Sequence, residues 1–201
     1  RFNGGIPPKS SADWGWVQHI LASLKDNGKA AIVLDTGAVS RGSGNSGSNK
    51  EKDIRKWFVD NDLVEAVLYL PENLFYNTTA PGIVIFLNKQ KPKNRKNKIF
   101  LANASNEFEK GDPKNFIPHN SQKKTIDAFL KWKEIDKFSK VISKEEIIKN
   151  DYNLSPSRYI HIAADEEYRP IEDIIEDLNV LEKEEWDINK ELKVIYRKLG
   201  F

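Results

Sequence analysis

Two periodicities of hydrophobic and polar positions run through the first two thirds of the chain. In residues 13–25 and 50–60, apolar side chains recur every three or four positions, which is the period of a helix with one buried face. Short apolar runs typical of strands lie at residues 29–34, 64–70, 82–87 and 98–102. A helix, a glycine turn and a buried strand in this order predict an α/β domain and favour a parallel sheet.

The apolar runs also predict where each strand lies in the sheet. The runs at 29–34 and 82–87 are apolar at consecutive positions, so we expect both faces of these strands to be covered. The run at 98–102 is expected at an edge of the sheet, followed by a loop at 103–120. The sequence therefore predicts three or four strands with flanking helices.

Helical patterns replace strands after residue 120. Residues 121–132 place apolar side chains on one face, and Ser143 with Glu146 forms the capping box that begins a further helix. From Asp165 onward, apolar residues recur mostly every three or four positions between charges. This pattern predicts an amphipathic helix or helical pair that packs on the body or on a partner helix. We therefore divide the chain into an α/β part, a helical extension and a helical tail, at residues 1–120, 121–164 and 165–201.

Composition excludes several kinds of site and compartment. The 201-residue chain has no Cys, which excludes disulfides, thiol catalysis and cysteine-ligated metals. Its three His are widely spaced, so we expect no metal site. No apolar run reaches the roughly 20 residues of a membrane span, and we find no secretion leader. We therefore expect a cytoplasmic protein with no membrane partner.

A glycine- and serine-rich stretch follows the first predicted strand. Residues 42–47 fit the pattern G-x-G-x-x-G, but a dinucleotide loop of this kind follows its strand directly and has an acid near the end of the next strand. Here the glycines begin several residues late, and Glu65 stands at the start of the next strand. We interpret the stretch as a mobile loop. The basic residues that border it are expected to contact phosphates: Arg41, Lys50 and Arg55.

A second concentration of cations lies further along the chain. Lys and Arg gather without an acid between residues 89 and 98, while residues from Asp165 onward are rich in Asp and Glu. The basic run is typical of a solvated turn, although such asymmetry can also mark a nucleic-acid face.

The loop between the strands at 64–70 and 82–87 carries a candidate ligand-binding group. It has about ten residues, more than a tight hairpin needs. Phe75 and Tyr76 are adjacent there and are followed by the small polar residues Asn77 and Thr78. An aromatic ring at the end of a sheet can stack on a planar ligand, such as a nucleobase taken out of its duplex. The alternative is that Phe75 caps the core beneath the loop.

Five segments in order resemble the modification subunit of type I restriction–modification systems, a family of adenine-N6 DNA methyltransferases. They are Ala12–Leu21, Gly28–Leu34, Asp53–Lys56, Leu70–Thr78 and Asn150–Ile160. The resemblance implies a Rossmann-like class I methyltransferase fold and transfer of a methyl group from S-adenosylmethionine to a flipped adenine. By loop position, Phe75 matches the aromatic residue that stacks on the adenine, with Tyr76 as the fallback.

The resemblance also implies partners. In the family, the modification subunit binds DNA and assembles with a specificity subunit, which reads the DNA sequence, and with a restriction subunit. The tail at 165–201 is our candidate for the specificity-subunit contact. Arg41, Lys50, Arg55, Asn77 and Thr78 are our candidates for contacts with DNA.

Two family motifs are absent from this chain. It has neither the acidic-aromatic, glycine-rich cofactor loop nor the Asn-Pro-Pro-aromatic motif. Ile6-Pro7-Pro8-Lys9 does not replace the latter, because Ile offers no hydrogen-bond acceptor and Lys is not aromatic. The chain therefore resembles the C-terminal half of the catalytic sheet plus the helical region. We expect no cofactor site in this chain alone, which should neither bind S-adenosylmethionine tightly nor methylate DNA.

Two other interpretations compete with a methyltransferase. One is a non-catalytic DNA-binding or assembly module with the same fold. The other is an unrelated α/β nucleotide-binding protein that uses Gly42–Gly47 as a phosphate loop, which the spacing disfavours.

Overall fold

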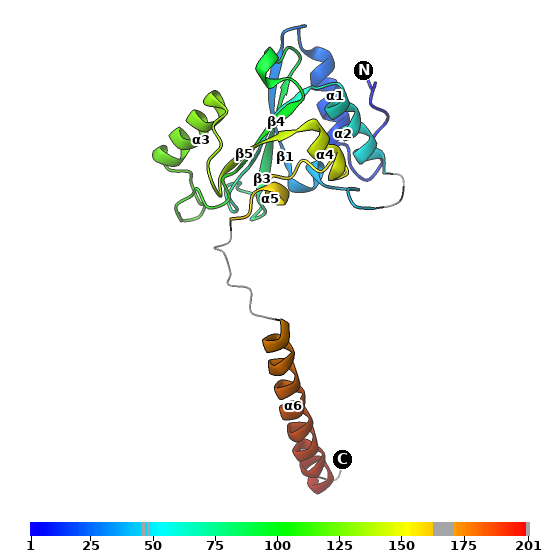
Figure 1. The fold of residues 1–201 in the computed structure, drawn as a ribbon, viewed down its shortest axis with the longest axis vertical. Helices are drawn as coiled ribbons and strands as arrows, with labels where there is room; N and C mark the ends of the chain where they lie inside the picture. The colour runs from blue at the N-terminus through cyan, green and yellow to red at the C-terminus, as the bar shows by residue number, and fades with distance from the viewer. Residues whose placement is uncertain (46, 48, 163–170, 200–201) are drawn as a thin grey trace. The chain divides into compact units, whose positions relative to one another are not determined.

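A five-stranded mixed sheet forms the centre of residues 1–162 in the computed structural model (Figure 1). The structure describes residues 1–45, 47, 49–162 and 171–199. The chain divides into two compact units, Arg1–Ile162 and Ala163–Phe201. The boundary expected between residues 164 and 165 lies outside the described residues.

The first unit contains both helices and strands, and its second, third and fourth strands follow one another without an α-helix between them. The strands are β1 (Lys29–Asp35), β2 (Val64–Tyr69), β3 (Gly82–Asn88), β4 (Lys98–Asn103) and β5 (Ser139–Ser143). The helices are α1 (Asp13–Ser23), α2 (Lys50–Asp60), α3 (His119–Lys131), α4 (Lys144–Lys149) and α5 (Pro156–Tyr159), with short 3₁₀ turns at Thr36–Val39 and Lys93–Arg95. All four predicted strands are present, together with β5, which was not predicted.

The strand order is β1-β3-β2-β4-β5, and only the β2–β4 pair is parallel. The expectation of a parallel sheet is therefore wrong for most neighbours. The reason is the hairpin that joins β2 to β3. After α2 carries the chain from β1 to β2, this hairpin reverses the chain and inserts β3 between them, antiparallel to both.

The edges of the sheet also differ from the prediction. β4 is not an edge strand, because β5 pairs with it along its outer side, from Lys98↔Ser143 to Ala102↔Ser139. β5 escaped prediction because its five residues lead directly into α4. The box residue Ser143 ends β5 and accepts a hydrogen bond from the Glu146 backbone N–H at 3.2 Å, which confirms the serine half of the predicted capping box.

β1 is the other edge strand, and it is not buried as expected. Its residues alternate between exposed and partly buried along its whole length, and the Val33 side chain is 55% exposed. One face of β1 packs on the core through Ala30, Ile32 and Leu34, while no described residue pairs with its outer edge. In contrast, the inner strand β3 is buried at five of seven positions, as expected.

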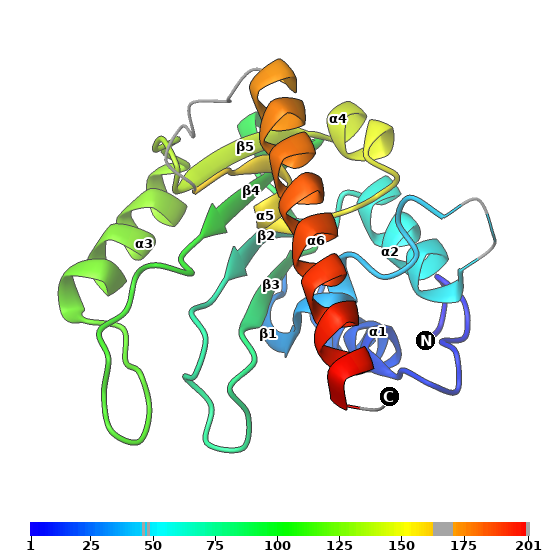
Figure 2. The ribbon, with the colours of Figure 1, turned by 90° about the horizontal axis from the view of Figure 1, so that it is seen from below.

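Helices cover the two faces of the sheet unequally. α1, α2 and α4 lie on one face and α3 on the other, as the two views show (Figures 1 and 2). The larger core joins Trp14 of α1, Phe58 of α2 and Ile147 of α4 to the sheet. The smaller one joins Ala128 of α3 to Phe100 and its neighbours. A bulge between Val64 and Ala66 in β2 allows Val64 and Val67 to face the same core.

The second unit contains α6 (Ile171–Leu199), a single amphipathic helix of 29 residues. Of the two forms predicted for the tail, an amphipathic helix or a helical pair, the structure has the first. No helix among residues 1–162 or 171–199 has the length and apolar content needed to cross a membrane.

Candidate functional site

Three loops leave the same edge of the sheet, at the carboxyl ends of β1, β2 and β4. The register places Asp35 opposite Gly82, Ile83 opposite Tyr69, and Tyr69 beside Asn103. Because β1, β2 and β4 point in one direction, their last residues meet at this carboxyl edge. Ligands of open α/β sheets bind outside the carboxyl ends of the strands. The loops at 36–49, 70–81 and 104–118 are therefore the candidate functional region.

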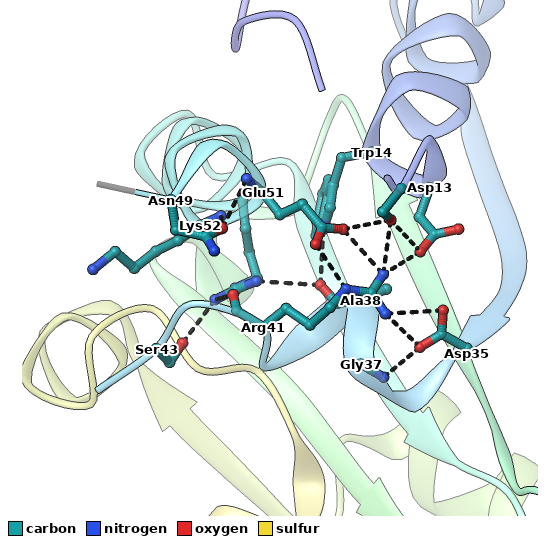
Figure 3. Close-up of polar contacts among 12 residues, drawn as sticks. Asp13, Trp14, Asp35, Gly37, Ala38, Arg41, Ser43, Asn49, Glu51 and Lys52 are labelled. Atoms are coloured by element: carbon teal, nitrogen blue, oxygen red, sulfur yellow. Dashed lines mark hydrogen bonds and ion pairs between the residues drawn. The ribbon is translucent and has the colours of Figure 1, made fainter. Parts of the chain in front are cut away.

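Arg41 organises the first loop (Figure 3). Its guanidinium donates to carboxylates from three elements: Asp13 at the start of α1, Asp35 at the end of β1, and Glu51 in the first turn of α2. The N–O distances to Asp35 and Glu51 are 2.8 and 2.7 Å. Three acids surround one cation, so the predicted role of Arg41 in attracting a phosphate is opposed by its own ion pairs.

The same cluster changes the acidity of Asp35. Burial alone raises the pKa of this carboxyl group, but hydrogen bonds from Arg41 and from the Gly37 backbone N–H outweigh burial and lower it below 3.8. Hydrogen bonds and ion pairs with Glu51 and Asp35 raise the pKa of Arg41. Asp35 and Arg41 are thus held in their charged forms at neutral pH.

Arg55 is a structural residue, and the prediction that it contacts phosphates is wrong for this structure. Its side chain is fully buried. It donates to the backbone carbonyl oxygens of Tyr152 at 2.6 Å, Ala38 at 3.2 Å and Arg41 at 3.0 Å. A fourth hydrogen bond, of 2.7 Å, reaches Ser43 Oγ. Burial lowers the pKa of Arg55 to about 10, which leaves it charged. A phosphate could reach this guanidinium only if the structure opened.

The described part of the glycine-rich loop is anchored rather than mobile as predicted. Ser43 Oγ donates to the Asp151 backbone carbonyl at 2.9 Å, and the Gly44 N–H donates to the Asp151 carboxylate at 2.8 Å. Gly42 has a φ of +81°, and a Cβ there would lie 2.3 Å from the Asn49 side chain. Packing and the positive φ therefore require glycine at position 42, and this glycine does not indicate a phosphate loop.

Of the three predicted phosphate-contacting cations, Lys50 is the exposed one. It is the first residue of α2, next to Asn49, whose side chain caps the helix by accepting from the N–H groups of Glu51 and Lys52. Lys50 therefore remains the candidate for a phosphate contact at this loop.

The second loop presents the predicted aromatic residues at the carboxyl edge. Phe75 is half-buried, and its ring packs against Gly82 so closely that a Cβ there would lie 2.9 Å from Cε2 of the ring. Tyr76 is 85% exposed, and Asn77 and Thr78 are exposed beside it. The ring of Phe75 thus lies at the surface of the sheet edge, and is neither sealed in the core nor free in solvent.

The third loop contains contact residues that are not apparent from the sequence. Lys114 and Asn115 donate hydrogen bonds to the second loop, at residues 70–81, which we call the aromatic loop. The stretch 103–120 lacks a periodic apolar pattern, so its sequence gave no signal for this contact. The backbone pairing of Glu109 with Phe116 likewise could not be predicted from the sequence pattern.

Cations of the basic run at 89–98 hold this turn to other parts of the first unit. Lys89 donates to the Leu24 carbonyl at 2.9 Å, and Lys91 donates to Asp62 at 2.5 Å. Arg95 pairs with the buried Glu65 at 3.1 Å. Three of the six cations are thus committed within the chain. In the part of the chain that the structure describes, no three His, Cys, Asp or Glu side chains are grouped so as to hold a metal ion.

Comparison with solved structures first defines the class of protein. The chain is similar to the type I restriction–modification methyltransferase subunit of Streptococcus thermophilus, with 38% identity and a TM-score of 0.68, over 75% of this chain and 31% of that one. The predicted α/β methyltransferase-like fold is therefore confirmed. A family model described as N-6 DNA Methylase matches residues 1–168, and the chain belongs to that family.

Two curated relatives from Methanocaldococcus jannaschii carry the names of methylase subunits of type I restriction enzymes. The MjaVII subunit is 45% identical over 94% of this chain, and the MjaVIII subunit is 48% identical over 90% of it. The chain spans about a third of the length of each relative, 32% and 30% respectively. The predicted family resemblance is confirmed, including its restriction to part of the relatives' length.

Replacing Arg55 tests its assignment to the fold. We expect Arg55→Ala to lower the free energy of unfolding by about 3 kcal/mol or more, because three backbone carbonyl groups lose a charged donor and the buried side chain leaves a cavity. The exposed Lys50 in the same helix is the matched control, and Lys50→Ala should change the unfolding free energy by less than about 0.5 kcal/mol. Urea unfolding of both variants measures the difference. Equal stability of the two variants would contradict the structural role.

Proposed function

We propose that this chain forms part of a site-specific DNA adenine-N6 methyltransferase, the modification subunit of a type I restriction–modification system. Membership of the N-6 DNA methylase family and the names of the relatives support the class of reaction. The observation that carries the proposal for this chain is the half-buried ring of Phe75 at the carboxyl edge, seated on Gly82. DNA is the proposed substrate, and the cytoplasm is the compartment that fits it.

The chemistry explains why an aromatic ring is needed. The adenine amine is a poor nucleophile, because its lone pair is delocalised into the ring. The base must therefore leave the duplex and be held rigidly while its amine is oriented toward the methyl donor. In our proposal, Phe75 stacks on the extruded adenine, with Tyr76 as the alternative ring. Asn77, Thr78 and Lys50 are exposed and contact the DNA nearby.

S-adenosylmethionine would supply the methyl group in the complete enzyme, but the described residues of this chain do not fit it. The glycine-rich loop packs on Asn49 and Asp151, and its backbone N–H at Gly44 already donates to a carboxylate. Arg41 is likewise surrounded by three acids. We therefore assign the cofactor to residues outside this chain.

The expected absence of a cofactor site can be measured directly. Isothermal titration calorimetry of this 201-residue chain with S-adenosylmethionine should show no binding at micromolar concentration, because Asn49 packs on Gly42 and the Gly44 N–H of the same loop already donates to Asp151. A complete methylase polypeptide that contains this chain is the positive control. Binding at micromolar affinity or tighter would contradict the assignment.

Replacing Phe75 tests the stacking role. In a complete methylase that contains this chain, assembled with its specificity subunit, we expect Phe75→Ala to lower kcat/KM for methyl transfer by about 10- to 100-fold, because stacking on a base contributes about 1–3 kcal/mol. Phe75→Trp keeps an aromatic face and should retain most activity. Transfer of labelled methyl groups to duplex DNA measures the effect.

Tyr76→Ala is the matched comparison in the same loop and should reduce methyl transfer less than Phe75→Ala. A larger loss from Tyr76→Ala would move the stacking role to Tyr76. A complete methylase that binds DNA together with its specificity subunit but transfers no methyl group would instead support the non-catalytic module with the same fold.

We further propose that α6 contacts the specificity subunit and that the restriction subunit joins the same assembly. Within its own unit, the helix exposes a row of large apolar side chains between charges, including Ile175, Leu178, Leu181 and Trp186. An amphipathic helix with an uncovered apolar stripe is suited to packing against a partner helix.

Deletion of residues 172–201 should abolish co-purification with the specificity subunit and leave the melting temperature of residues 1–162 unchanged. A finer test compares neighbours on the helix. Leu178→Lys should weaken the complex about tenfold or more, because it places a charge in the apolar stripe. Asn179→Lys makes the neighbouring position cationic and should not weaken it. Co-purification that survives the deletion would remove the proposed contact.

A further inference from the structure

The loop at residues 104–118, which we call the brace, is hydrogen-bonded to the aromatic loop on both sides of Phe75 and Tyr76. Lys114 Nζ donates to Asn73 Oδ1 at 2.9 Å and to the Thr78 carbonyl oxygen at 3.2 Å. Asn115 donates through its backbone N–H to the Asn73 carbonyl at 3.0 Å and through Nδ2 to the Glu72 carbonyl at 3.1 Å. Four hydrogen bonds thus join segments about 40 residues apart in sequence.

The aromatic loop has few other restraints of its own. Its internal hydrogen bonds include Asn73 N–H to the Thr79 carbonyl at 2.9 Å and a long bond of 3.3 Å from the Thr78 N–H to the Phe75 carbonyl. Asn73 adopts a left-handed conformation with φ of +54°, and the side chains from Tyr76 to Thr79 are exposed. An exposed loop of this kind has a conformational entropy that must be lost before it can hold a ligand.

The brace is itself fixed to the body of the first unit. At its start, the Ala104 N–H donates to the Tyr69 carbonyl at 2.9 Å. In its middle, Glu109 and Phe116 exchange backbone hydrogen bonds of 2.9 and 3.1 Å. The tight turn between them requires glycine at 111, where a Cβ would lie 2.3 Å from the Lys114 carbonyl oxygen. Glu107 forms an ion pair with Lys124 of α3.

We propose that Lys114 and Asn115 are positioning residues for methyl transfer, which hold the aromatic loop in the conformation that receives the flipped adenine. This inference rests on the proposed function of Phe75. Lys114 reaches both sides of the segment that carries the ring, and Asn115 fixes its beginning. The loop is therefore ordered before DNA binds, and the flipped base does not have to order it.

The test measures base flipping as well as methyl transfer, in a complete methylase that contains this chain and is assembled with its specificity subunit. A duplex with 2-aminopurine at the target adenine becomes more fluorescent when the base leaves the stack. We expect Lys114→Met combined with Asn115→Ala to reduce that rise by at least half and to lower kcat/KM by about 10- to 100-fold, because four hydrogen bonds to the loop are weakened or lost. The affinity for the duplex should stay within about threefold, because these residues do not contact the DNA.

Two variants distinguish a positioning role of Lys114 from an effect of its charge on DNA binding. Lys110→Met removes an exposed cation from the same loop and should leave flipping and turnover within about twofold. Lys114→Arg keeps the charge and the N–H donors and should restore most of the fluorescence change. If Lys110→Met and Lys114→Met are equally defective, or if the loss at Lys114 appears only as weaker, salt-dependent duplex binding, the ammonium acts on DNA phosphates and the inference is overturned.

The Phe75→Ala variant distinguishes failure of the brace inference from failure of the proposed function. If Phe75→Ala reduces flipping and turnover while the Lys114 and Asn115 variants do not, the brace inference fails and the proposed function stands. If Phe75→Ala has no effect either, the proposed function fails as well. Asn115→Ala alone removes the Nδ2 donor and leaves the backbone hydrogen bond, so it provides a milder variant whose melting temperature should stay close to that of the parent protein.

Discussion

The insertion of β3 between β1 and β2 is the constraint on which the rest of the first unit depends. Because β3 runs antiparallel to both neighbours, the loop that precedes it lies at the edge where β1, β2 and β4 end. Gly82 begins β3 and provides the flat surface on which the Phe75 ring rests. Any other register would move the aromatic loop away from the Arg41 cluster and the brace. The topology of one hairpin therefore gathers all three loops of the candidate site.

The two arginines at this edge form ion pairs and hydrogen bonds within the protein that stabilise the fold. Arg41 and Arg55 are adjacent to the glycine-rich loop in sequence, and both resemble phosphate-contacting residues. In three dimensions, Arg41 is enclosed by three carboxylates, and Arg55 is buried under backbone carbonyl oxygens. Such a buried guanidinium orders the surrounding loops, because its donors hold together the carbonyl oxygens of Ala38, Arg41 and Tyr152. The DNA contacts that we propose therefore come from the exposed Lys50, Asn77 and Thr78.

Local pattern was sufficient for most elements. α2 matches its predicted limits because Asn49 caps it and Ile54 and Phe58 mark its buried face. The pattern was insufficient for neighbour relations, because an apolar run such as Lys29–Leu34 has the same composition in a central strand and in an edge strand. β5 was missed because Val141 and Ile142 are too few apolar residues to distinguish a strand from the entry to a helix. The brace was missed because hydrogen bonds between loops leave no periodic trace.

The sequence by itself determined the α/β class, the four longer strands, the amphipathic tail and the aromatic pair at Phe75 and Tyr76, because periodicity, caps and loop composition are local properties. Only the tertiary structure decided that the sheet is mixed, that Arg55 is a buried anchor, that Gly42 is required by packing, and that Lys114 and Asn115 support the aromatic loop. These features depend on which distant residues share one small volume, and the physical reason they escape local pattern is that burial and hydrogen bonding are satisfied by the whole fold.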